Sequence, residues 1–290
     1  MTTVTLLHPG SMGAAVGAQA TAAGHRVHWV PDGRGNASHA RAEQAGLIPA
    51  ESLDEALAAS DLVLSICPPH AAEQVASAVA ASDYRGIYID ANAISPQRML
   101  RIEANMAREC TVVDGAIIGP PPTDDRSARL YLAGNEGTLG LLAKVFAGSS
   151  VHVREVGPDL GAASALKMAF ASYQKPARAL AGVAHALATS HGVADLLTAE
   201  AQTMSSQILS DPDYLPSVAA RAWRWAPEML EVEETLQAAS LPTDFAQAAA
   251  AVMEHWEQNK DITLPLATIL SQLHDAEPEQ ASHAASQDLA

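Results

Sequence analysis

Apolar residues in the first half of the chain follow two alternating patterns. Short runs of Val, Ile and Leu have the composition of buried strands, and each precedes a stretch with apolar residues at helical spacing. Strands are predicted at residues 4–8, 26–30, 61–66, 86–90, 111–113, 129–133 and 151–153. Helices are predicted at residues 11–23, 40–45, 71–80, 95–107 and 139–146, with a short one capped by Ser52. This alternation predicts an N-terminal Rossmann domain of the α/β class, a doubly wound parallel sheet.

The pattern changes after residue 153, where no convincing strand follows. Residues 160–189 form an alanine-rich helical stretch that Pro176 is expected to kink or split. Further helices are predicted at residues 195–209, 215–222, 227–239, 244–259 and 264–274. The sequence therefore predicts an α/β domain over residues 1–157, an all-α domain over 158–274 and a disordered tail over 275–290.

Charge and composition narrow the range of partners. The 17 Lys and Arg residues face 33 Asp and Glu, a formal net charge of −16 that disfavours nucleic acid and membrane surfaces as partners. No apolar run approaches the ~20 residues of a membrane helix, and the first residues enter a strand without a secretion signal. The cysteines Cys67 and Cys110 suggest no disulfide scaffold, so a cytoplasmic protein is expected. No metal site is predicted.

A glycine-rich turn follows the first strand. In His8-Pro9-Gly10-Ser11-Met12-Gly13, Gly10 and Gly13 match the second and third glycines of a dinucleotide-binding fingerprint, while His8 occupies the first position. The turn also opens a helix, whose free N–H groups suit a pyrophosphate. An ordinary glycine-rich turn is the alternative interpretation.

The loop after the second strand gives two conflicting signals about the cofactor. Asp32 lies 19 residues after Gly13, where an acidic side chain accepts a hydrogen bond from the ribose 2′-OH of NAD. Arg34 lies two residues further, and a guanidinium suits the 2′-phosphate of NADP. Both could also be solvated turn residues.

Polar residues follow two further strands, at the end where open α/β sheets bind ligands. Cys67, Pro68 and His70 follow one strand; Cys67 is more typical of a small buried thiol than of a nucleophile, and His70 could simply begin a helix. After the next strand, Asn92 is placed to hydrogen-bond a ligand, whereas Ser95 is more typical of a helix cap. Residues 114–122, with two glycines and three prolines, are expected to form a stiff loop with exposed N–H groups.

Lys167 is the only lysine in the apolar stretch of residues 162–170. A buried lysine either finds a partner or loses its charge, and a lowered pKa suits general acid–base work on a carbonyl. Lys167 and Gln174, seven residues apart, should share a helix face. A lysine that extends to solvent is the alternative.

Together these motifs resemble the β-hydroxyacid dehydrogenase superfamily, which includes 6-phosphogluconate dehydrogenase, 3-hydroxyisobutyrate dehydrogenase and the imine reductases. The similar segments are residues 10–13, 24–25, 90–96, 114–120 and 161–167. Residues 67–70, 114–122 and 221–225 look closer to a phosphogluconate-dehydrogenase-like subgroup whose C-terminal helical domain has no known function. The chain departs from the family at Asn92 and Ile118, where relatives have Ser, and at Ala171, where they have Asn.

The resemblance implies a dehydrogenase or reductase acting on a small hydroxy or oxo compound, with Lys167 as general acid–base and Asn92 and Gln174 as orienting groups. It implies cofactor contacts at residues 10–13, Cys67, Pro68, His70 and Asn92. Residues 33–35 align with the segment that binds the 2′-phosphate in NADP-dependent relatives, so NADP is favoured over NAD. Phosphogluconate itself is not expected as the substrate, because the substrate-binding Ser and Asn positions differ.

The resemblance also implies a homodimer with interlocked helical domains. An imine reductase and a non-catalytic dinucleotide-binding protein are the alternatives; Lys167 argues against the first, and Ile118 with Ala171 suggests the second.

Overall fold

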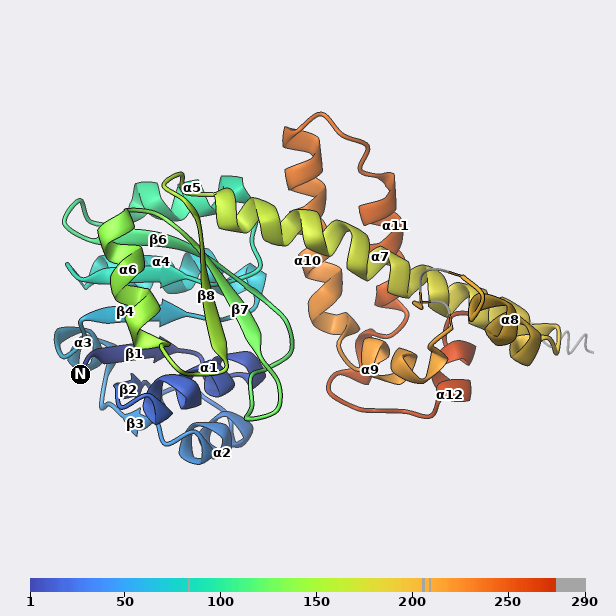
Figure 1. Ribbon diagram of the computed structural model, residues 1–290, viewed down its shortest axis with the longest axis horizontal. Helices are drawn as coiled ribbons and strands as arrows, with labels where there is room; N and C mark the ends of the chain where they lie inside the picture. The colour runs from blue at the N-terminus through green and yellow to red at the C-terminus, as the bar shows by residue number, and fades with distance from the viewer. Residues whose placement is uncertain (83, 205–206, 209, 275–290) are drawn as a thin grey trace, which may run out of the picture. The chain divides into compact units, whose positions relative to one another are not determined.

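The computed structural model describes residues 1–290 except 83, 205–206, 209 and 275–290. Within the described part, the chain forms two compact units (Figure 1). Unit 1 contains residues 1–176 and 224–251, and unit 2 contains residues 177–223 and the described residues from 252 onward. The predicted domain division at residue 157 remains a prediction. The predicted tail, residues 275–290, lies outside the described residues.

Unit 1 is built on a sheet whose strand order is β3-β2-β1-β4-β5-β6-β7-β8. The predicted Rossmann fold is confirmed, with one difference from an all-parallel sheet: β6 and β7 pair antiparallel, while the other neighbours are parallel. Strand β8 continues four residues beyond the predicted end at Val153. The strands are β1 Thr3–Leu7, β2 Arg26–Trp29, β3 Ile48–Pro49, β4 Leu62–Ser65, β5 Ile87–Asp90, β6 Thr111–Ile118, β7 Ala128–Ala133 and β8 Val151–Gly157.

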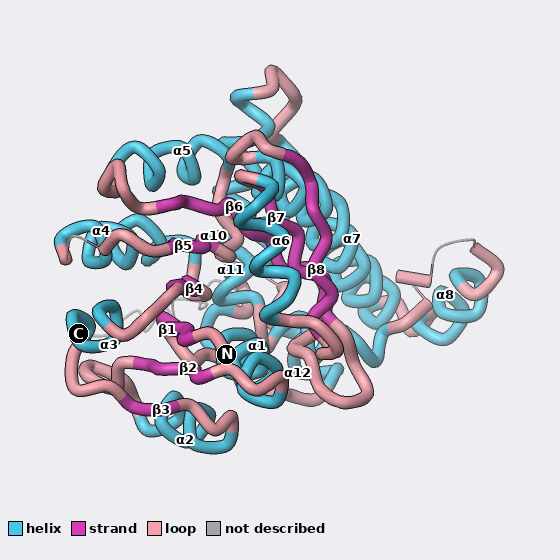
Figure 2. The backbone as a smooth tube through the Cα atoms, turned by 60° about the vertical axis from the view of Figure 1, so that its left-hand side comes forward, coloured by secondary structure: helices cyan, strands magenta, loops and turns pink. Residues whose placement is uncertain are grey.

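Helices cover both faces of this sheet (Figure 2). Alternate strand residues point to opposite faces, so Leu64 packs in the core beneath α1, α2 and α6, whereas Val63 packs beneath α3, α4 and α5. The result is a three-layer arrangement with two apolar cores. The helices are α1 Ser11–Ala22, α2 Asn36–Gln44, α3 Leu53–Ala58, α4 Ala72–Ala81, α5 Pro96–Asn105 and α6 Glu136–Val145, and a 3₁₀ turn at Pro69–Ala71 precedes α4.

The loop predicted at residues 114–122 is wrong in its first half. Residues 114–118 belong to β6, are buried and pair with β7. Gly115 is needed there for packing, because a Cβ at this position would lie 2.9 Å from the backbone oxygen of Asp90 on β5. The glycine therefore reflects close approach of two strands, and the loop begins only after Ile118.

Two prolines lie inside helices that the sequence pattern divided. Helix α7, Ala162–Ser190, runs through Pro176 without a break, so the expected split is wrong. Helix α10, Ala222–Ala238, likewise begins five residues before Pro227. A proline removes one main-chain hydrogen bond, and α7 nevertheless continues, with Ala171 and Ala179 buried on either side of Pro176.

Unit 2 is helical in its described part. Trp256 is fully buried and donates its indole N–H to the Ile269 carbonyl at 2.8 Å. Gly182 on α7 allows this packing, since a Cβ there would lie 2.9 Å from the Trp256 ring. No helix among the described residues is long and apolar enough to span a membrane. The remaining helices of the chain are α8 Ala194–Ala201, α9 Leu215–Ala219, α11 Asp244–Glu254 and α12 Leu266–Ser271, with 3₁₀ turns at Pro212–Tyr214 and Glu257–Asn259.

Candidate functional site

The strand order brings the predicted site residues to one edge of the sheet. Strands β1, β4, β5 and β6 are parallel neighbours, so their carboxyl ends lie along the same edge. The strand order reverses between β1 and β4, which is where open α/β sheets bind ligands. The glycine-rich turn follows β1, Cys67 follows β4 and Asn92 follows β5.

The glycine-rich turn has the form that a pyrophosphate requires. A Cβ at Gly13 would lie 2.4 Å from the His8 carbonyl oxygen, so only glycine fits between this turn and the first helical turn. Gly10 is the N-cap of α1, and a Cβ there would meet nothing within 4 Å. No side chain caps this helix and its first turn has no acidic residue. The first N–H groups of α1 thus suit an anion, and the residues present fit a dinucleotide.

His8 replaces the first glycine of the fingerprint without changing the backbone shape. Its φ of 72° lies in the left-handed region that glycine normally occupies. Burial, together with the positive charge of Arg34, lowers the pKa of His8 to about 4. The imidazole is therefore neutral at pH 7 and adds no charge to the turn.

Arg34 is directed toward this turn. Its charge acts on both His8 and Cys67, and its Nε is buried with no hydrogen-bond partner among the described residues. Asp32 is exposed in the same loop. Arg41, which the sequence analysis did not single out, donates from Nε to the Pro9 carbonyl at 3.1 Å and so ties α2 to the turn.

Asn92 joins the ends of β4 and β5. Its Oδ1 accepts from the Cys67 N–H at 2.5 Å, and its Nδ2 donates to the Ser65 hydroxyl at 3.1 Å. Burial, with a further contribution from Asp90, raises the pKa of the Cys67 thiol to about 12, so it stays protonated. Asn92 is buried and shapes the loop, while His70 is exposed in the 3₁₀ turn that follows.

Asp90 is a buried carboxyl beneath this loop. It accepts from the Tyr88 hydroxyl at 3.2 Å and from the Asn92 N–H at 3.1 Å. Burial raises its pKa to about 7, although these hydrogen bonds favour the charged form. Asp90 therefore holds the Asn92 backbone in place from below.

Lys167 lies at the carboxyl end of β6. Its ammonium group donates to the Ile117 carbonyl at 3.0 Å and lies 3.7 Å from a Glu228 carboxylate oxygen on α10. The side chain is 19% exposed, so Lys167 is partnered but still accessible. Gln174 is half-buried, and it is the next residue, Lys175, that pairs with Glu228. Sequence spacing could not reveal Glu228, because it comes from a helix about 60 residues further along the chain.

Asp114 fixes the start of α7. Its carboxylate accepts from the N–H groups of Ala163 at 2.8 Å and Ser164 at 3.0 Å, and from the Ser164 hydroxyl at 2.6 Å. The first turn of the helix that carries Lys167 is thereby attached to β6. Ile118 and Ala171, which stand where relatives have polar residues, are both buried.

A second set of contacts attaches α10 to α5. Glu231 accepts from the Ser95 N–H at 2.9 Å and pairs with Arg98 at 2.8 Å. Glu234 accepts from the Ser95 hydroxyl at 2.8 Å and pairs with Arg101. Ser95 caps α5 as predicted, accepting from the Arg98 N–H, and in addition anchors the helix that carries Glu228.

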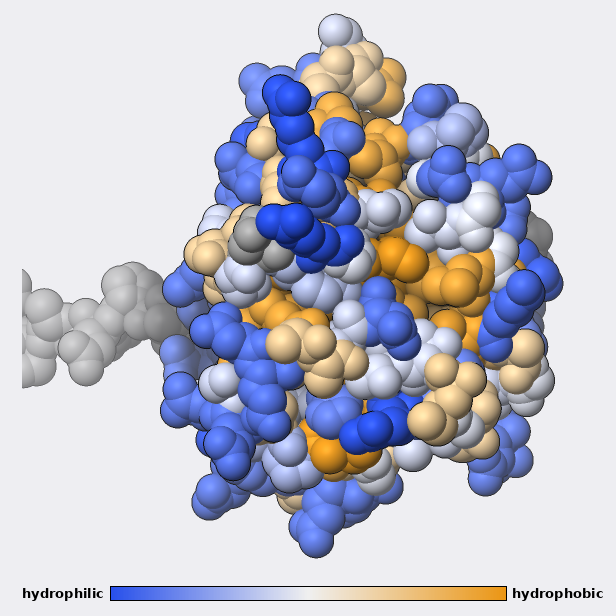
Figure 3. Space-filling view, turned by 90° about the vertical axis from the view of Figure 1, so that its left-hand side faces the viewer, coloured by the Kyte–Doolittle hydropathy of each residue, from blue (hydrophilic) through white to orange (hydrophobic). Residues whose placement is uncertain are grey.

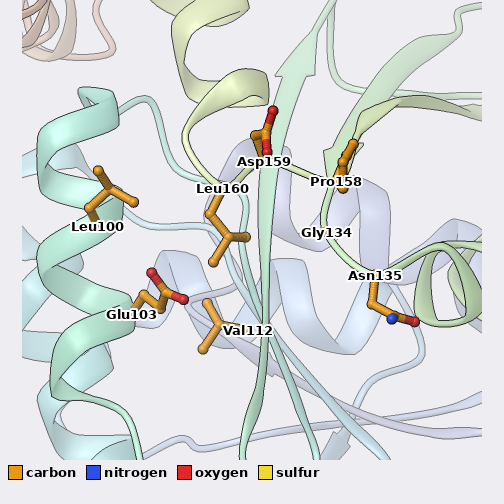
Figure 4. A pocket seen from close by; sticks show the side chains of 8 residues that line it. All are labelled: Leu100, Glu103, Val112, Gly134, Asn135, Pro158, Asp159 and Leu160. Carbon is orange, nitrogen blue, oxygen red and sulfur yellow. The ribbon is translucent and has the colours of Figure 1, made fainter.

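A pocket of about 410 Å³ lies away from these residues (Figure 4). It is near the amino end of β6, whereas Lys167 contacts the carboxyl end, and it contains none of the predicted site residues. Figure 3 shows the side of the molecule that lies at the left of Figure 1, and hydrophilic residues occupy most of the outline of this face. The pocket is lined by Leu100, Glu103, Val112, Gly134, Asn135, Pro158, Asp159 and Leu160.

Two family models match parts of the chain. Residues 3–94 match the family described as NADP oxidoreductase, coenzyme F420-dependent. Residues 188–256 match a domain of unknown function, DUF1932. The resemblance found in the sequence is confirmed. An N-terminal match to an oxidoreductase family model is thus followed by a match to a DUF1932 segment.

Solved structures share this fold over nearly the whole chain. Mycobacterium tuberculosis 3-hydroxyisobutyrate dehydrogenase has a TM-score of 0.74 at 18% identity, covering 95% of this chain and 100% of its own. The protein Psf3, solved with NADP⁺ and 2-OPP, has a TM-score of 0.67 at 17% identity, covering 93% and 100%. MTH1747, a conserved protein similar to 3-hydroxyacid dehydrogenases, has a TM-score of 0.63 at 24% identity, covering 89% and 97%.

These likenesses establish the fold. A comparison with curated protein sequences found no match.

Proposed function

We propose that the protein is an NADP-dependent oxidoreductase that interconverts a small hydroxy compound and its oxo form. The observation that carries this proposal is the position of Lys167. Its ammonium group lies at the same sheet edge as the glycine-rich turn and is held by the Ile117 carbonyl and Glu228. A hydride carrier and a proton donor belong together in such a reaction.

The cofactor would be held by groups that follow the carboxyl ends of β1, β2, β4 and β5. The N–H groups of residues 10–13 would bind the pyrophosphate, and Arg34 would bind the 2′-phosphate. The segment from Cys67 to His70 and the loop held by Asn92 would line the nicotinamide ribose. When bound, the nicotinamide supplies or accepts a hydride at the substrate carbon.

Lys167 would complete the reaction with a proton. In reduction, its ammonium group gives a proton to the substrate oxygen as the carbon gains a hydride; in oxidation, the neutral amine takes the hydroxyl proton. Asn92 would act by shaping the loop through its bonds to Cys67 and Ser65. Gln174, one residue from Lys175 on α7, remains a proposed orienting group.

The test is a fluorescence titration of NADPH and NADH against the wild-type chain and Arg34→Ala. We expect NADPH to bind more tightly than NADH, and the variant to lose about tenfold or more of its NADPH affinity while NADH affinity changes little. Asp32→Ala, in the same loop, is the matched control and should leave NADPH binding intact. Preferential NADH binding that depends on Asp32 would contradict the choice of cofactor.

Activity is then sought with NADPH and a panel of oxo acids, aldehydes and cyclic imines, with Lys167→Met as the blank. Turnover of an oxo compound that Lys167→Met abolishes would support the proposed reaction. Turnover of imines alone, unaffected by this variant, would instead identify an imine reductase. Tight NADPH binding without oxidation of the cofactor across the panel would identify a non-catalytic binding protein.

We further propose a homodimer that associates through α7. Exposed apolar side chains recur along this helix every seven residues, which is typical of a helix that packs against another. Their exposed fractions are 37% for Leu166, 66% for Tyr173, 59% for Leu180 and 61% for Leu187.

We also propose a cytoplasmic location, which the two free cysteines support.

A further inference from the structure

Glu228 lies between two lysines of the same helix. Its carboxylate oxygen Oε1 forms an ion pair with Lys175 and lies 3.7 Å from the ammonium nitrogen of Lys167. Lys175 is 4% exposed and Glu228 is 7% exposed, so this ion pair is well shielded from water. Lys167, in contrast, is accessible.

The charges around Glu228 do not balance within this cluster. Besides the two lysines, Arg224 of α10 acts on the same carboxylate, and the Trp225 ring lies 5.5 Å from the Lys175 ammonium. Burial lowers the pKa of Lys175 to about 8, and the charge of Glu228 opposes this shift. Burial alone would raise the pKa of Glu228, but Lys175, Lys167 and Arg224 together more than offset this effect, so the pKa is lowered and the carboxylate stays ionised.

We propose that Glu228 and Lys175 are positioning residues that act together on the proton of Lys167. This proposal rests on the proposed function of Lys167. Glu228 holds the ammonium form of Lys167 near the Ile117 carbonyl, and Lys175 withdraws part of that carboxylate's charge.

The physical reason lies in the state that follows proton transfer. When Lys167 gives its proton away, a Glu228 paired only with Lys167 would become a buried, unpaired charge, which is strongly unfavourable. Near neutral pH, below the pKa of about 8 of Lys175, the Lys175 ammonium remains as the closest counter-ion, with Arg224 acting on the same carboxylate, and it offsets this penalty. In that pH range the pair therefore allows Lys167 to cycle between ammonium and amine, because Glu228 keeps a cationic partner in both states.

The experiment measures the rate at which acetic anhydride modifies Lys167 between pH 6 and 7.5, where Lys175 is still mostly charged, read by mass spectrometry of the modified peptide. Lys144, an exposed lysine on α6, is the internal reference. In Lys175→Met, Glu228 loses its nearest cation and attracts the Lys167 ammonium more strongly, so the modification of Lys167 relative to Lys144 should slow about tenfold. In Glu228→Gln, two ammonium groups lack their carboxylate, so the relative rate should increase by a similar factor.

Two further variants separate charge from structure. Lys175→Arg keeps the charge and should stay near wild type. The double variant Lys175→Met/Glu228→Gln removes both charges, leaves no unpaired buried ion and should lie between the two single variants. An unchanged relative rate in Lys175→Met, or changes of the same direction in both single variants, would overturn the proposal, because loosened structure moves both the same way.

The labelling needs neither cofactor nor substrate. Its outcome is therefore independent of the NADPH titration and of the substrate panel, and either hypothesis can fail while the other holds.

Discussion

His8 adopts a backbone conformation that is normally reserved for glycine. Glycine is expected where a strand turns sharply into a phosphate-binding helix, and His8 adopts the left-handed φ of 72° at that place. The neighbouring requirement at Gly13 is stricter, because a Cβ there would lie 2.4 Å from the His8 carbonyl oxygen. The incomplete fingerprint therefore still forms the turn.

We predict that His8 makes stability fall in mild acid. Its pKa of about 4 in the folded protein lies below the 6.5 of a histidine in an unfolded chain. As pH falls from about 6.5 to about 4, the unfolded chain therefore binds the proton first and the free energy of unfolding decreases. Allowing for the partial exposure of the ring, wild type should lose about 1 kcal/mol more unfolding free energy than His8→Gly between pH 7 and pH 5. Urea unfolding at both pH values measures this; equal losses would contradict it.

At the scale of elements, the contacts between α5 and α10 position Glu228. Ser95 was predicted as a helix cap from its place before Pro96, and the structure confirms this. No local pattern indicated that Glu231 and Glu234 would also bind Ser95, because contacts between separate helices leave no trace in residue spacing. One residue thus caps its own helix and fixes another.

We predict unequal effects for the two glutamates. Glu231→Gln should lower the free energy of unfolding by about 2 kcal/mol, because it leaves a mostly buried Arg98 with a weakened partner. Glu234→Gln, at a half-exposed pair, should cost about 0.5 kcal/mol. Chemical unfolding compares the free energies of unfolding of the two variants. Amide hydrogen exchange in the first turn of α5 should become faster in Glu231→Gln and stay unchanged in Glu234→Gln. Equal losses would show that burial of Glu231 is not what matters.

At the scale of the whole molecule, the exposed apolar residues spaced by seven along α7 find no partner among the contacts described within one chain. Leu180 and Leu187 are each more than half exposed. The net charge of −16 keeps separate molecules apart unless a specific apolar surface joins them. A second copy of the same helix is the simplest partner that matches the seven-residue spacing.

We predict a dimer in solution that depends on these exposed residues. Light scattering after size-exclusion chromatography should give twice the mass of one chain for wild type and a single-chain mass for Leu180→Lys/Leu187→Lys. Leu141→Lys, at an exposed position on α6, is the control and should stay dimeric. A wild-type monomer would exclude the proposed assembly, and a dimer that survives the double substitution would place its interface elsewhere.

The sequence by itself determined the alternation of strands and helices, the glycine-rich turn and the cap at Ser95. Each depends on local rules: side-chain periodicity, backbone freedom at Gly13 and hydrogen bonding within one helical turn. The strand assignment failed at residues 114–118, where a glycine serves close packing against β5. The split expected at Pro176 does not occur, since α7 continues through this residue.

Only the tertiary structure decided which partners surround Lys167. Glu228 belongs to another helix, and its carboxylate brings Lys175 of α7 into the same group of charges as Lys167. Electrostatic partners in a protein interior depend on distance in space and on exclusion of water, neither of which is encoded in local spacing. The residues of the turn could thus be predicted from sequence, whereas the charge cluster around Lys167 could not.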